Sequence, residues 1–139
     1  MTITDMTMPD AIKLVREYLT ETAEVSALVS TRILARTGDP LPTRPFVRLD
    51  LAGGTPVVKQ RLDRARIQIH VVGDPESEVT CMSTANTIRA ALAYCRNFVG
   101  DDGVITGCDI ESGPALLWDE THTPPLVDVT FAVAVYLHP

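Results

Sequence analysis

The expected fold of this chain is decided by residues 64–78, RARIQIHVVGDPESE, where a regular alternation gives way to a turn. Apolar and polar side chains alternate over eight residues, which is the period of a β-strand with one buried face. The apolar positions are Ala65, Ile67, Ile69 and Val71, and the polar positions are Arg66, Gln68 and His70. Asp74 and Pro75 then suit the cap and the first position of a helix. The stretch therefore predicts a strand that leads directly into a helix.

The spacing of apolar residues indicates where the helices lie on either side of this strand. The helix after it is expected at residues 76–95, with an apolar stripe of Cys81, Ala85, Ile88, Leu92 and Cys95. A first helix is expected from Pro9 and Asp10 onward, with Ile12, Val15 and Leu19 on its apolar stripe. A shorter helical turn should follow, with Val25, Leu28 and Val29 directed inward.

Other segments have the composition and alternation of strands. Residues 31–37, TRILART, predict a short strand before a proline-rich loop. Residues 45–54, PFVRLDLAGG, predict a strand that ends at Gly53 and Gly54, with Val47, Leu49 and Leu51 toward the core and Phe46, Arg48 and Asp50 away from it. Residues 104–119 are expected to be extended and broken near Pro114, and residues 125–139, PLVDVTFAVAVYLHP, alternate most regularly of all.

Residues 55–63, TPVVKQRLD, connect two of the predicted strands and are expected to be the exposed loop of a hairpin. The loop is longer than the two to five residues usual for hairpins. It carries Val57, Val58 and Leu62, and exposed apolar residues on a long loop suggest contact with a neighbouring molecule. Taken together, the elements predict a single α+β domain over residues 1–139, a mainly antiparallel sheet of about five strands with two main helices packed on one face.

The composition limits the classes of protein to which the chain can belong. Its 139 residues, 45% of them hydrophobic, suffice for one ordinary core. No apolar run is long enough to cross a membrane, and the N-terminus lacks the features of a secretory signal. Three cysteines, Cys81, Cys95 and Cys108, are an odd and sparse set that suits a reducing cytoplasm without a disulfide framework.

The charge is negative overall and unevenly distributed. The net charge is −6, yet eight of the twelve basic residues fall between Arg32 and Arg66. The segment from His70 onward contains ten acidic residues and only two basic ones. An acidic chain is poorly suited to grip a phosphate backbone, because that affinity comes from neutralising phosphates. A basic region and an acidic region in one chain could instead bind copies of the chain head to tail.

The sequence contains no recognisable catalytic or cofactor motif. His70, His122 and His138 have no metal-ligand spacing, and the cluster Asp119, Glu120 and His122 has no matched nucleophile. The glycines form no phosphate-binding loop and no nucleophile elbow. We therefore expect no catalytic residues, no cofactor and no metal, and the polar face of the sheet is left as a surface for solvent or for another protein.

The order of the segments and their residue patterns resemble a known family, the tail terminator proteins of long-tailed bacteriophages, also called tail completion or minor tail proteins. The resemblance lies in LVSTRILART at the end of the opening helix, PFVRLDLAGG after a proline-rich loop, RIQIHVVGDPESEVTCMSTANTIRAAL at a strand-to-helix junction, and PPLVDVTFAVAVYLHP as the last strand. It implies a structural protein of the virion, present in the host cytoplasm during assembly. Such proteins have a sheet with helices on one side.

The resemblance also implies partners. Copies would form a ring, usually hexameric, on the last ring of tail tube protein, stop tube growth and offer a surface to the head or neck connector protein. DNA would pass through the ring without specific binding, and no membrane would be involved. The candidate residues for contact with another subunit or with the tail tube are Arg48, Val57, Val58, Lys59, Arg61, Leu62, Arg64, Arg66, Asp119 and Glu120.

Three alternatives stay open at this point. A neck or stopper protein of the head–tail connector belongs to the same functional class. A small cytoplasmic enzyme, using His70 or the Asp119–His122 cluster, and a monomeric binding module belong to other classes.

Overall fold

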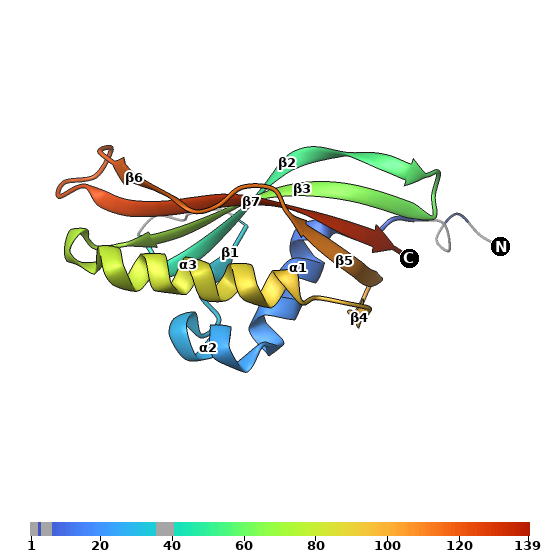
Figure 1. Ribbon diagram of the computed structural model, residues 1–139, viewed down its shortest axis with the longest axis horizontal. Helices are drawn as coiled ribbons and strands as arrows, with labels where there is room; N and C mark the ends of the chain where they lie inside the picture. The colour runs from blue at the N-terminus through green and yellow to red at the C-terminus, as the bar shows by residue number, and fades with distance from the viewer. Residues whose placement is uncertain (1–2, 4–6, 36–40) are drawn as a thin grey trace.

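The computed structural model describes residue 3 and residues 7–35 and 41–139 of the chain. A long, curled sheet forms one layer, and the helices form a second layer on one of its faces (Figure 1). The described elements are α1 (Ala11–Glu21), α2 (Ala23–Val29), β1 (Ile33–Leu34), β2 (Phe46–Val58), β3 (Leu62–Gly73), α3 (Glu78–Ala93), β4 (Phe98–Val99), β5 (Val104–Ile110), β6 (Ala115–Asp119) and β7 (Leu126–His138). The predicted α+β class is confirmed; the described residues form seven strands, where about five were expected, and three α-helices, where two main ones were expected.

The sheet is built around β7. The strand order is β1-β2-β3-β7-β5-β4, and β6 also pairs with β7. Every pairing is antiparallel except that of β1 with β2. β3 and β7 pair without a register shift from Asp63 opposite Leu137 to Gly73 opposite Val127. This uninterrupted pairing joins the two most regularly alternating segments of the sequence, so the alternation correctly predicted the centre of the sheet.

The strand-to-helix stretch folds as expected, with one change at the turn. Ala65, Ile67, Ile69 and Val71 are all buried on the helical side of the sheet. Pro75 begins a single 3₁₀ turn (Pro75–Ser77) before α3, so the α-helix itself covers residues 78–93 and not 76–95. The Asp74 side chain makes no cap hydrogen bond, which corrects that expectation, because its carboxylate instead accepts a hydrogen bond from Arg44 Nε at 2.5 Å.

The helices bury most of the residues that the stripes predicted, but Ile12 of α1 is only partly buried and one residue of α2 is exposed. In α2, Val25 and Val29 are buried, whereas Leu28 is 38% exposed and the prediction that it faces inward is wrong. With only seven residues, α2 has one narrow buried face, and Leu28 lies at its margin. In the first predicted strand, β1 covers only Ile33–Leu34, and residues 36 and 37 lie outside the described residues.

The largest correction concerns β2, which does not end at Gly53 and Gly54. It continues to Val58 and pairs with β3 as far as Leu62, so the expected loop is a strand and a tight turn. The pairing of β2 with β3 shifts its register between Leu51 and Gly54, where the two glycines lie. Gly53 has φ +100°, a conformation that favours glycine, and a Cβ on Gly54 would collide with the Arg64 carbonyl. Leu51, expected in the core, is 61% exposed because the buried alternation of β2 ends at Leu49.

Phe46 is a second exception on β2. It faces away from the helices, as predicted, but it is buried in a small cluster with Val72 and Leu126. The outer face of the sheet therefore carries a minor core of its own. None of the helices in the described residues is both long and apolar enough to cross a membrane.

Candidate functional site

The end of the β2–β3 hairpin is the most exposed part of the sheet. We call residues 55–62 the tip: it holds the last residues of β2, a turn closed by a hydrogen bond from Arg61 N to Val58 O (2.9 Å), and the first residue of β3. The tip lies at one end of the molecule, beyond the C-terminal end of β7 (Figure 1). Val57 and Val58 are about half exposed there.

The tip carries positive charge that no carboxylate of the described residues neutralises through an ion pair. Lys59 and Arg61 are both exposed, and among the described residues no carboxylate lies within ion-pair distance of either. Five of the ten candidate contact residues fall at this tip: Val57, Val58, Lys59, Arg61 and Leu62. The tip therefore combines exposed valines with two unpaired cations.

The arginines on the outer face of β3 are held within the chain. Glu111 binds Arg64 Nη2 at 3.0 Å and Arg66 Nε at 2.7 Å, and these two guanidinium groups lower the pKa of its carboxyl. Arg64 Nε also donates to the Tyr136 hydroxyl (3.3 Å), which in turn donates to Asp109 (2.9 Å). Arg64 and Arg66 thus hold the outer face of the sheet together, and their two positive charges share the single negative charge of Glu111.

A second polar network covers the other end of the same face. His70 lies between two carboxylates, with Nδ1 at 3.0 Å from Asp128 and Nε2 at 3.2 Å from Asp50, and Asp50 also binds Arg48 Nε at 3.2 Å. The His70 side chain is only 14% exposed. Next to it, Gln68 donates to the Thr130 hydroxyl. The outward-facing side chains of β3, Arg66, Gln68 and His70, therefore all find hydrogen-bond partners within the chain.

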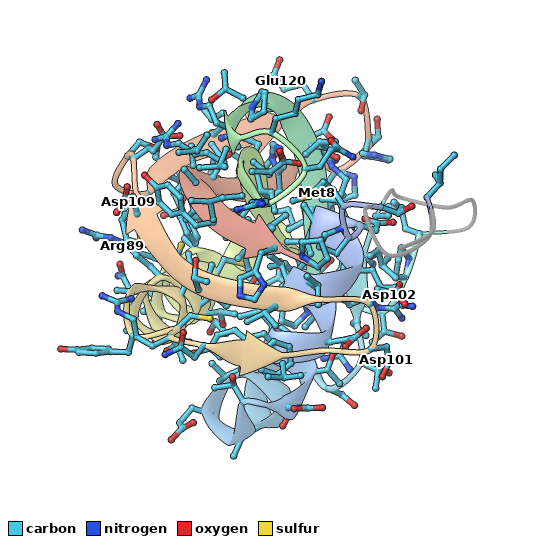
Figure 2. All side chains as sticks on the ribbon, turned by 90° about the vertical axis from the view of Figure 1, so that its right-hand side faces the viewer. Met8, Arg89, Asp101, Asp102, Asp109 and Glu120 are labelled. Carbon is cyan, nitrogen blue, oxygen red and sulfur yellow. The ribbon has the colours of Figure 1, made fainter. Side chains whose placement is uncertain are left out.

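Asp119 and Glu120, the remaining candidates, lie at the turn between β6 and β7, away from the tip. Asp119 accepts hydrogen bonds from the hydroxyl and backbone N–H of Thr121, which lower the pKa of its carboxyl, and His122 Nε2 lies 3.7 Å away. Glu120 is exposed at the edge of the molecule (Figure 2). The ten candidates are thus divided among the tip, the polar face and this turn, and do not form one site.

Sequence reasoning missed a groove along the outer side of α3. Its volume is about 970 Å³, and it is bounded by the α1–α2 junction on one side and by Leu116 of β6 on another. The lining comprises Tyr18, Thr22, Glu24, Glu78, Val79, Met82, Ser83, Asn86, Thr87, Ala90, Ala91, Tyr94 and Leu116. A signal was present in the sequence: residues 79–88 contain no charge, whereas the solvent face of a helix is normally polar and charged.

The cysteines offer no reactive thiol. All three are free and buried. Burial raises the pKa of Cys95 to about 11 and that of Cys108 to about 12, so neither forms the thiolate that a nucleophile needs at neutral pH. Within the described residues, no three histidine, cysteine or acidic side chains converge as a metal site would require.

Comparison with solved structures gives the class of fold to which the chain belongs. A chain from a structure described as "Virion of native gene transfer agent (GTA) particle" superposes with a TM-score of 0.65, covering 93% of this chain and 95% of that one at 16% identity. At that identity the match shows a shared fold. No curated protein matches the sequence.

The particular family follows from the sequence itself. The model of the family described as "Tail completion protein gp17" matches residues 13–133, so the chain belongs to that family. It is a structural component of a phage-like virion, located in the tail, and it is not an enzyme. The resemblance drawn from the order of its segments is thereby confirmed.

Proposed function

We propose that copies of this chain close into a ring, hexameric as in the proteins it resembles, that caps the tail tube. The ring stops tube elongation and presents a surface to the head or neck connector protein. Membership of the tail completion family supports this role. The observation that carries it is the tip, on a chain whose net charge is −6: it exposes Val57 and Val58 beside Lys59 and Arg61, and neither cation has an ion-pair partner in the described part of the chain.

A ring of identical copies needs two different patches on each copy, because each contact is made between unlike surfaces. The tip is one such patch, and it is basic and partly apolar. The later half of the chain, with ten acidic residues against two basic ones from His70 onward, offers surfaces of the opposite sign. Opposite charges orient the copies as they meet and disfavour contact between two tips.

The same charge balance suits a conduit for DNA. A phosphate backbone binds where cations neutralise it, and an acidic wall repels it. The cations on the polar face are compensated by carboxylates of the same chain, as in the pairs of Arg66 with Glu111 and Arg48 with Asp50. A ring made of such subunits would let DNA pass and would not retain it.

The test is to produce particles without the protein and to examine them by electron microscopy. We expect tails of irregular, excessive length that carry no heads, and restoration of uniform length when the wild-type chain is supplied. Tails of normal length that fail to join heads would place the protein in the neck. Normal particles would contradict the proposal altogether.

A further inference from the structure

We propose that the tip of one copy docks in the α3 groove of the next copy, so that tip and groove are the two halves of the contact that builds the ring. This inference rests on the proposed ring. It assigns a partner to the groove, namely a second copy of this chain.

The groove has an apolar floor that lacks a cover in the isolated chain. Val79 and Tyr94 are 83% and 84% exposed, and Met82 and Leu116 are partly exposed between the flanking elements. The exposed lining of the groove is mainly apolar, with Ser83, Asn86 and Thr87 among its polar members, and an exposed apolar surface is typical of a protein–protein contact. Tyr94 adds an aromatic side chain with a hydroxyl, a residue type enriched at such contacts.

The rim of the groove is acidic. Glu24 at the start of α2 and Glu78 at the start of α3 are both exposed and line it, and the described residues place no carboxylate–cation pair at either. The lining contains no lysine and no arginine. The groove therefore suits an occupant with apolar side chains next to positive charges.

The tip has this combination within five consecutive residues. Val57 and Val58 would cover the apolar floor, and Lys59 and Arg61 would lie opposite the glutamates of the rim. The two surfaces cannot meet within one copy. The tip lies at one end of the molecule, and β6 with the beginning of α3 lies toward the other (Figure 1), while the view onto the tip end shows α3 end-on at the side of the molecule (Figure 2).

The alternative mode of contact, pairing of strand edges between copies, is disfavoured at this tip. Beyond its pairing with β1, the outer edge of β2 carries Pro56, which has no backbone N–H to donate. Register shifts at residues 51–54 and 56–58 also make the edge irregular. Such features block the addition of a further strand, so docking through side chains is the mode that the tip supports.

Cysteine cross-linking in assembled particles tests the contact. The native cysteines are buried, so a chain with Val58→Cys and Asn86→Cys presents new thiols only at the tip and in the groove. We expect mild oxidation to yield a ladder of covalent oligomers, up to the full ring. The matched control is Val58→Cys with Val99→Cys, since Val99 is 73% exposed on β4 and does not line the groove; it should yield no ladder.

The possible results separate this inference from the proposed function. Particles that contain both double variants in normal amount, with no ladder from the first, would overturn tip-in-groove docking and leave the ring intact. A bond between position 86 and a tube or neck protein would also overturn it, because the groove would then hold another partner. If the wild-type chain is present in particles as a single copy, the ring itself is refuted.

Discussion

Arg66 Nε lies 2.7 Å from Oε1 of Glu111, a residue in the connection between β5 and β6. Arg64 binds the other carboxylate oxygen at 3.0 Å, so one glutamate accepts both guanidinium groups from β3. These pairs cross over β7 and fix the outer face of the sheet next to the tip. They show that the outward-facing arginines of β3 bind a carboxylate of the same chain. Lys59 and Arg61 therefore remain as the cations that the tip can offer to another molecule.

Glu111→Gln should lower the free energy of unfolding by about 0.5–1 kcal/mol at neutral pH, as expected for partly exposed ion pairs. The pKa of Glu111 is lowered in the folded chain, so its ionised form stabilises the fold above the unfolded pKa. That stabilisation is lost as the pH falls through the lower, folded pKa. Urea unfolding of both chains should therefore show a difference at pH 7 that begins to shrink near the unfolded pKa of about 4.3 and vanishes below the lower, folded pKa. A difference that grows in acid would contradict the assignment.

Ile69→Ala should be far more costly, because Ile69 is completely buried opposite Phe131 in the β3–β7 pairing. Truncation leaves a cavity in the main core, and we expect a loss of about 2–5 kcal/mol in the free energy of unfolding. Val99→Ala is the matched control, since Val99 is 73% exposed, and it should change stability by less than about 0.5 kcal/mol. Equal effects of the two substitutions would refute the assigned core.

Gly54→Ala should disturb the tip and spare the body of the domain. A Cβ at position 54 would collide with the Arg64 carbonyl of the paired strand, whereas one at Gly113 meets nothing within 4 Å. We expect Gly54→Ala to cost about 1–3 kcal/mol through local overpacking and to increase proteolytic cleavage near residues 55–62. Gly113→Ala should behave as the wild type. Unchanged cleavage and assembly in Gly54→Ala would contradict the prediction, because they would show that a side chain at position 54 does not disturb the tip.

Exchange of charges tests the tip and the groove as a pair. Lys59→Glu with Arg61→Glu should reduce the yield of complete particles by about tenfold or more, since like charges would then face each other across a contact. Glu24→Lys with Glu78→Lys should do the same, and the combination of all four should restore much of the yield. Lys59→Arg with Arg61→Lys, which preserves charge, is the control. Circular dichroism must show that every variant folds, and failure of the combination to rescue folded variants would count against the pairing.

Much of the fold could be predicted from the sequence because its two central strands alternate so regularly. Ala65 through Val71 and the valines of β7 specify one buried face without ambiguity, and Pro75 marks the beginning of the next helix. The tip was mispredicted as a loop because Gly53, Gly54 and Pro56 all disfavour a regular strand. The structure accommodates them with register shifts, which local preferences do not reveal.

The polar network and the groove needed the tertiary arrangement. Asp50, His70 and Asp128 come from β2, β3 and β7, and their contact depends on the order and register of those three strands. The groove joins α3 to Tyr18 and Leu116, which lie far apart in the sequence. Only the uncharged run at residues 79–88 pointed to it, and that run also fits a helix buried on all sides.

The most direct test of the account is an averaged electron micrograph of native particles at the junction of tail tube and head, with this protein identified by an antibody or tag. We expect a single closed ring of identical copies at the head-proximal end of the tube, surrounding an open channel. A solitary copy, a position at the far end of the tail, or the absence of the protein from mature particles would contradict it.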